Sequence, residues 1–89
     1  MLSAAERKSL KARAHKLEPV VLIGSKGITD EVVKEVETAL KAHELVKVRA
    51  PALEREAREE AMHTLCERTG AQSVQTIGKV LVIYRKRDE

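Results

Sequence analysis

The stretch VVLIGSKGITDEVV, residues 20–33, constrains the fold more than any other part of the sequence. Residues 20–23 are apolar without alternation, which is typical of a strand that is covered on both faces. Two glycines, Gly24 and Gly27, follow within four residues, and Thr29 or Asp30 is suited to cap a helix. The stretch therefore predicts a buried strand, a tight loop and a helix, which together begin a β-α-β unit.

The other apolar patterns predict the remaining elements. Ser3 and Glu6 have the spacing of a capping box, so a helix is expected over residues 4–17, with Leu10, Ala14 and Leu17 inward and Pro19 after its end. Helices are also expected over residues 30–43 and 53–69, and strands over 45–49, 73–77 and 80–84. Gly78 and Lys79 suit a type II′ turn between the last two strands.

This order, α-β-α-β-α-β-β, predicts an α/β fold, more narrowly an α+β two-layer sandwich with a four-stranded mixed sheet. The strands at 20–23 and 80–84 are apolar throughout and are expected in the centre of the sheet. The strands at 45–49 and 73–77 are more mixed and are expected at its edges. Because 89 residues can bury one modest core, residues 1–89 are predicted to form a single domain.

Charge is unevenly distributed along the chain, whose net charge is +3. Residues 1–19 carry five bases and two acids, whereas residues 28–44 carry two bases and five acids, and residues 51–70 three and five. Folding could gather the basic segments on one side, which would suit a polyanion such as nucleic acid. An alternative is a protein-interaction adaptor that uses the two acidic helices.

The loop formed by Gly24, Ser25, Lys26 and Gly27 is a candidate phosphate site. Its glycines permit close approach of another backbone, and the helix behind it is expected to point free amides toward the loop. It matches neither a Walker A loop nor a dinucleotide fingerprint. A simple turn and a small nucleotide-binding enzyme remain as alternatives for this loop.

Other chemistry is not indicated. Cys66 is the only cysteine, and His15, His43 and His63 lack metal-ligand spacing, so neither a metal nor another cofactor is expected. No nucleophile is paired with a base, and catalysis is not expected either. The chain has no signal-like start and no membrane-spanning apolar run, which predicts a cytoplasmic location. The terminal residues 85–87, followed by Asp88 and Glu89, are expected to form a solubilising tail.

Three segments, residues 14–33, 39–48 and 74–85, resemble the YhbY-type CRM (chloroplast RNA splicing and ribosome maturation) domain, in the order of that family. The resemblance implies a KH-like fold similar to the C-terminal domain of translation initiation factor three, and RNA binding. It implies association with ribosomal RNA in precursors of the large (50S) subunit, and assistance in ribosome assembly. A general RNA-binding or splicing accessory role is the alternative within the family. Ser25 stands where many relatives have a base.

RNA binding by this chain is expected to depend on phosphate and sugar contacts, because Tyr84 is the only aromatic residue and cannot build a stacking platform. The family's GxxG loop maps onto Gly24–Gly27, and Lys26 supplies its charge. Three basic residues of the first helix, Lys11, Arg13 and Lys16, are expected to extend the phosphate contacts beyond the loop. Three further basic residues are weaker candidates: Lys47, Arg49 and Lys79. The protein is expected to be a monomer without a small-molecule substrate.

Overall fold

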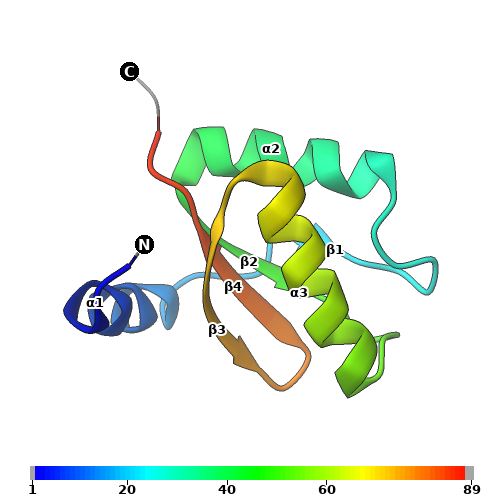
Figure 1. The fold of residues 1–89 in the computed structure, drawn as a ribbon, viewed down its shortest axis with the longest axis horizontal. Coiled ribbons are helices and arrows are strands. Elements are labelled where there is room, and N and C mark those ends of the chain that lie inside the picture. Colours follow the sequence, from blue (N-terminus) through cyan, green and yellow to red (C-terminus); the bar gives the residue numbers. More distant parts are fainter. Residues whose placement is uncertain (1, 88–89) are drawn as a thin grey trace.

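Helices and strands follow one another in the predicted order, α-β-α-β-α-β-β (Figure 1). The computed structural model describes residues 2–87. Its helices are α1 (Ala4–Ala14), α2 (Asp30–His43) and α3 (Arg55–Thr69). Its strands are β1 (Val21–Leu22), β2 (Leu45–Arg49), β3 (Gln72–Ile77) and β4 (Val80–Tyr84). The predicted α/β fold with a four-stranded mixed sheet is confirmed.

The order of strands in the sheet is β1-β2-β4-β3, so the predicted positions are half right. Strand β4 is central and β3 is an edge, as expected. Strand β1, expected in the centre, is an edge that pairs in parallel with β2, and β2, expected at an edge, is central. Unbroken apolar content therefore does not distinguish a central strand from an edge strand in this sheet.

Strand β1 is buried on one face only, which corrects the prediction of cover on both. Val21 and Ile23 are 4% and 0% exposed and belong to the main core, whereas Val20 and Leu22 are 55% and 59% exposed. Helix α2 packs on the buried face. Helix α1 packs against β2 and β3 and leaves the second face of β1 open.

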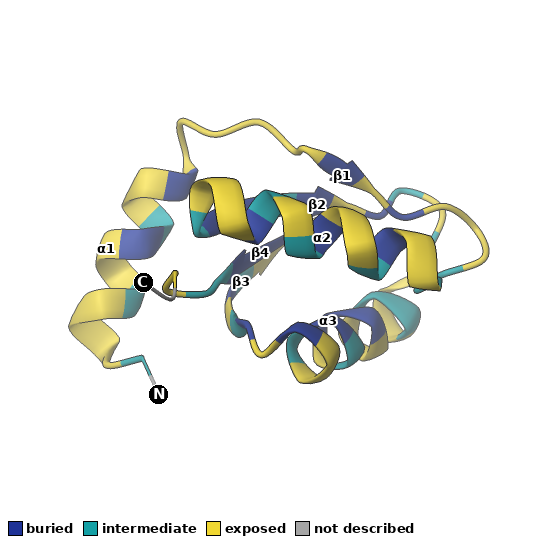
Figure 2. Cartoon of the chain, turned by 90° about the horizontal axis from the view of Figure 1, so that it is seen from above, coloured by how far each residue is buried: buried dark blue, intermediate teal, exposed yellow. Residues whose placement is uncertain are grey.

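The core has two parts, one on each face of the sheet (Figure 2). Helices α2 and α3 cover one face, where Leu40, Leu65 and Ile83 are fully buried. Helix α1 lies on the opposite face and packs Leu10 and Ala14 against a smaller cluster from β2, β3 and β4. Helix α1 therefore forms a third, partial layer beside the two layers that were predicted.

Helix α1 begins as predicted and ends three residues early. The capping box is present: the Ser3 hydroxyl accepts from the Glu6 amide at 3.1 Å, and the Glu6 carboxylate accepts from the Ser3 amide at 3.0 Å. After Ala14 the chain turns, and the Leu17 amide donates back to the Ala14 carbonyl at 3.0 Å. Leu17, expected inward, is 39% exposed because the segment must leave the helix axis to reach β1. The guanidinium of Arg7 fastens the helix to the Ser73 carbonyl of β3.

Local capping rules place most of the other boundaries correctly. Thr29 caps α2, with its hydroxyl accepting from the Val32 amide at 3.2 Å. Helix α3 begins two residues later than predicted and ends at Gly70, which takes the left-handed conformation at φ +74°. The turn between β3 and β4 has Gly78 at φ +55°, as the first position of a type II′ turn requires.

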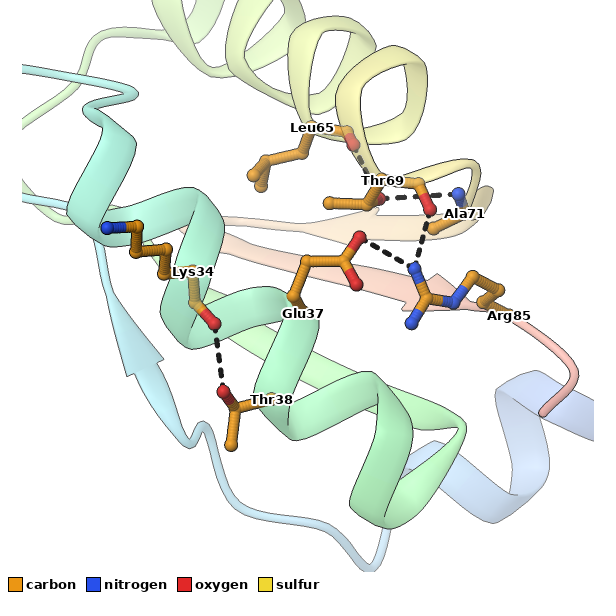
Figure 3. A network of polar contacts seen from close by, with 7 residues as sticks. All are labelled: Lys34, Glu37, Thr38, Leu65, Thr69, Ala71 and Arg85. Atoms are coloured by element: carbon orange, nitrogen blue, oxygen red, sulfur yellow. Dashed lines mark hydrogen bonds and ion pairs between the residues drawn. The ribbon is translucent and has the colours of Figure 1, made fainter. Parts of the chain in front are cut away.

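Arg85 connects three elements instead of belonging to a tail, as the sequence suggested (Figure 3). Its Nη1 donates to Oε1 of Glu37 in α2 at 2.7 Å and to the carbonyl of Thr69 at the end of α3, also at 2.7 Å. Arg87 lies 3.8 Å from the Glu44 carboxylate. Asp88 and Glu89, the rest of the expected tail, lie outside the described residues.

Candidate nucleic-acid interface

The GSKG loop is a closed turn with an open outer side. The Gly24 carbonyl accepts from the Gly27 amide at 3.0 Å, and Ser25 and Lys26 stand exposed between them. Gly27 has φ +73°, a conformation that favours glycine, whereas Gly24 has an ordinary φ. A Cβ at either position would meet no protein atom within 4 Å. The fold therefore requires glycine at Gly27 and has no local need for it at Gly24.

The start of α2 contributes less to an anion site than the sequence suggested. Residues 28 and 29 separate the loop from the helix, and the Val32 amide already donates its hydrogen bond to the Thr29 hydroxyl. Asp30 and Glu31 place two carboxylates in the first turn of α2. The hydrogen bond from Arg68, at 2.9 Å, holds the pKa of the Asp30 carboxyl below its usual range, so this carboxyl stays ionised. Phosphate binding here must therefore depend on the amides of the loop itself and on Lys26.

A groove of about 540 Å³ brings together three of the predicted bases. It runs between the end of α1, residues 16–20 and the start of β2, and Arg13, Lys16 and Lys47 line it. The Lys47 ammonium also donates to the Leu17 carbonyl at 3.1 Å, which holds its side chain across the groove. The other lining residues are Leu17, Glu18, Val20, His43, Leu45 and Val46.

His43 was not predicted as part of this site. The sequence indicated only that it lacks the spacing of a metal ligand. In the structure it is exposed and lines the groove beside the three bases. Only the packing of α1 against β2 brings it close to Arg13 and Lys16, so no sequence pattern near His43 could have indicated the role.

Arg49 lies in a second groove that continues the first. This groove, of about 420 Å³, is lined by residues 18–22 and Arg49. Glu18 and Val20 line both grooves, so the two meet along residues 18–20. Lys79 is close to Arg49 in the sheet, because the Lys79 carbonyl accepts from the Ala50 amide at 2.8 Å. Of the weaker candidates, Lys47 thus lies beside the end of α1, whereas Arg49 and Lys79 lie farther along the sheet.

The GSKG loop and helix α1 lie at opposite ends of the longest axis of the molecule (Figures 1 and 2). This axis extends 33 Å. Lys26 is therefore not adjacent to the α1 bases, although the two regions are only about ten residues apart in sequence. Lys11 is half-buried on α1, and Arg13 and Lys16 are exposed near its end. The candidate residues form a track along the molecule, with the two grooves between its ends.

None of the seven predicted bases makes an ion pair with an acid of residues 2–87. The arginines that do form such pairs are Arg55, Arg68, Arg85 and Arg87. A base without a carboxylate partner keeps its attraction for an external phosphate. Seven of the bases without an ion pair thus lie along the track, whereas acids such as Glu56, Glu59 and Glu60 line a separate shallow groove on α3.

Three comparisons relate this chain to known proteins. The family model described as the CRS1 / YhbY (CRM) domain matches residues 2–85. A protein of Haemophilus influenzae named "RNA-binding protein" is 42% identical over 99% of this chain and 89% of its own length. A probable RNA-binding protein of Pseudomonas aeruginosa is 38% identical, covering 96% of this chain and 82% of its own. The solution structure of a hypothetical protein from Staphylococcus aureus matches with a TM-score of 0.88 and 34% identity, over 100% of this chain and 93% of that chain.

Proposed function

This chain belongs to the CRS1 / YhbY (CRM) domain family, and on that premise we propose that it binds RNA along the track from α1 to the GSKG loop. The resemblance drawn from three segments of the sequence is thereby confirmed. Similar proteins named for RNA binding support the proposal. The single observation that carries it is that seven bases of this track have no ion-pair partner among residues 2–87.

In this proposal the RNA backbone is held at both ends of the molecule. Arg13, Lys16 and Lys47 neutralise phosphates in the first groove, and Arg49 and Lys79 continue the path. At the far end, the exposed amides of the loop and Lys26 hold a further phosphate. Binding of this kind releases counterions, so it weakens steeply as salt rises. It needs no catalytic group, cofactor or metal.

We further propose that the RNA is ribosomal RNA in precursors of the large (50S) subunit, and that the protein assists assembly in the cytoplasm. Contacts to phosphates recognise the shape of a folded backbone more than its sequence. Such recognition suits an RNA that is structured but not yet covered by its final protein partners. Splicing assistance would use the same contacts on a different RNA.

The first test is binding to ribosomal RNA fragments across a salt series. Lys26→Glu and the double variant Arg13→Gln/Lys16→Gln are compared with wild type, and Arg55→Gln on α3 is the control. Each lost phosphate contact should reduce the slope of log K against log salt by roughly 0.7 to 0.9. The control should keep the wild-type slope. Wild type that binds no RNA at low salt would refute the proposal.

Other outcomes distinguish the rival functions. If Lys26→Glu binds as wild type does, the loop is only a turn and the α1 groove carries the binding. Saturable binding of a free nucleotide at one site would favour a small phosphate-ligand enzyme. Binding to a protein partner that survives all of these substitutions, but is lost when the acids of α3 are neutralised, would favour the adaptor.

A sedimentation experiment tests the ribosomal part separately. The tagged protein should migrate with particles that are lighter than the mature large subunit and contain unprocessed ribosomal RNA. Arg13→Gln/Lys16→Gln should migrate there less, whereas Arg55→Gln should behave as wild type does. Migration only with RNA other than ribosomal precursors would contradict the ribosomal role and leave RNA binding in place.

A further inference from the structure

A single row of side chains crosses all four strands of the sheet. Leu22 of β1 is aligned with Arg49 of β2, Arg49 with Val80 of β4, and Val80 with Ile77 of β3. Aligned residues on neighbouring strands point to the same face. We call Leu22, Arg49, Val80 and Ile77 the open row.

The open row lies on the face of the sheet that α1 covers elsewhere. On β4, Val82 is two residues beyond Val80 and is fully buried under α1. On β2, Leu45 is likewise buried in the α1 cluster, four residues before Arg49 on the same face. Helix α1 therefore covers one end of this face, and the open row is at the uncovered end.

Apolar side chains of the open row are exposed together. Leu22 is 59% exposed and Ile77 is 45% exposed, with Val80 half-buried between them. Val20, in the next row beside Lys47, is 55% exposed. Four large apolar side chains are exposed in residues 2–87, and three of them are on this part of the sheet. An exposed apolar group of this kind, next to charged residues, is typical of a binding surface.

We propose that the open row contacts the nucleobases of a single-stranded segment of the bound RNA, while Arg49 and Lys47 hold the phosphates of that segment. This inference rests on the proposed function and assigns a contact for the bases, where the sequence indicated only phosphate and sugar contacts. Leu22 and Ile77 lie on the two edge strands, so the flat face of one nucleobase can cover Leu22 and that of another can cover Ile77, much as nucleobases cover aromatic rings in other single-strand binding proteins. Arg49 lies between Leu22 and Val80 in the row, and its guanidinium can pair with a phosphate or stack on a nucleobase.

Position along the track also favours RNA. Val20 lines the groove that holds Arg13 and Lys16, and Gly24 of the GSKG loop is two residues after Leu22. An RNA strand that is held by the α1 bases at one end of the protein and by the GSKG loop at the other end can cross the open row between them. The row is therefore continuous with the proposed phosphate contacts on each side.

Charge argues against a second copy of this chain as the occupant. The open row contains one basic side chain, Arg49, and no carboxylate. The adjacent row contains one basic side chain, Lys47, and no carboxylate; its other members are Val20, Val82 and Gln75. Glu18, which lines both grooves, is the one acid in their linings. A two-fold pairing of this face would bring Arg49 and Lys47 of both copies together without neutralisation.

The test compares substitutions that change apolar contact with one that changes charge. Leu22→Ser/Ile77→Ser should weaken binding of a short single-stranded RNA about fivefold or more and leave the salt slope unchanged, because no charge is lost. Arg49→Gln should lower the slope by roughly 0.7 to 0.9. Leu22→Tyr should strengthen binding by adding a ring on which a base can stack. Thr76→Ala is the control, because it changes an exposed residue beside Ile77 that points to the other face.

A second ligand isolates the contribution of the RNA nucleobases to binding. An oligomer of the same length with abasic riboses should bind wild type and Leu22→Ser/Ile77→Ser equally, since it has nothing to place on the open row. Thermal melts of each variant verify folding, which these exposed positions should not disturb.

The inference is overturned if Leu22→Ser/Ile77→Ser binds single-stranded RNA as wild type does. It is also overturned if wild type is a dimer in size-exclusion chromatography that these substitutions dissociate, because a second copy then covers the row. Absence of any RNA binding by wild type is a different result, which refutes the proposed function itself.

Discussion

Replacing Arg85 by methionine should destabilise the protein without changing how the folded molecule binds RNA. Arg85 donates from Nη1 to Glu37 Oε1 and to the Thr69 carbonyl, both at 2.7 Å, and so ties the end of β4 to α2 and α3. The side chains of Arg85 and Glu37 are only 23% and 32% exposed. Methionine keeps much of the aliphatic stem and removes both hydrogen bonds.

The size of the effect follows from these two contacts. A hydrogen bond to a charged group contributes about 1.5 to 3 kcal/mol when it is well buried. Partial exposure reduces each contribution, so the free energy of unfolding should fall by about 2 kcal/mol in total. In a domain of this length, about 2 kcal/mol lowers Tm by roughly 8 to 16 °C.

Thermal and urea denaturation measure this loss, with Lys86→Met as the matched control. Lys86 is the exposed neighbour of Arg85 and forms no ion pair within residues 2–87. Glu37→Gln should cost less than Arg85→Met and should add little to it, because the two side chains act through one contact. Each kcal/mol of lost stability corresponds to roughly 4 to 8 °C in Tm, so a Tm of Arg85→Met within about two or three degrees of that of Lys86→Met would mean a loss below 1 kcal/mol and would refute the reasoning.

The same contact predicts a dependence on pH. The hydrogen bond from Arg85 lowers the pKa of the Glu37 carboxyl in the folded protein. The folded pKa is then below the unfolded one, so the contact stabilises fully above the ordinary carboxyl range and is lost as pH falls through the lowered pKa. The stability difference between wild type and Arg85→Met should therefore shrink in acid to the part that the hydrogen bond to the Thr69 carbonyl contributes. Curves that stay parallel down to the lowest pH would contradict this assignment.

Three further predictions test the loop, the core and the cysteine. Gly27→Ala should lower the free energy of unfolding in urea by about 1 kcal/mol because of its positive φ, whereas Gly24→Ala should stay within about 0.5 kcal/mol; equal losses would contradict the assigned backbone conformations. Leu65→Ala should cost about 2 to 5 kcal/mol, since Leu65 is fully buried, and a loss below about 1 kcal/mol would show that the site is not packed as described. Burial raises the pKa of the Cys66 thiol, so a disulfide reagent should modify it more slowly in the native protein than in urea, and equal rates would contradict its burial.

Much of the secondary structure could be predicted because local chemistry determines it. Thr29 and the acidic first turn mark the start of α2, and its residues agree with the prediction. Ser3 and Glu6 mark the start of α1, and Gly70 marks the end of α3. The residues that set each of these boundaries lie within one turn of one another in sequence, so a short stretch contains the required information.

Predictions that depend on distant packing were less successful. The apolar residues 20–23 suggested a central strand, but only one face of β1 is covered, because α1 packs over β2 and β3. Arg85 resembled part of a charged tail, and its partners Glu37 and Thr69 are 48 and 16 residues away in the chain. No local pattern reports contacts over such separations.

The sequence by itself determined the order of the elements, the family and the list of candidate bases. Only the tertiary structure decided how these bases are arranged: Arg13, Lys16 and Lys47 meet in one groove with His43, and the GSKG loop between β1 and α2 lies at the other end of the molecule. It also left Leu22 and Ile77 exposed in one row with Arg49. The physical reason is that hydrogen bonding between strands and the docking of α1 place residues from distant parts of the chain on one face, and neither is encoded in local spacing.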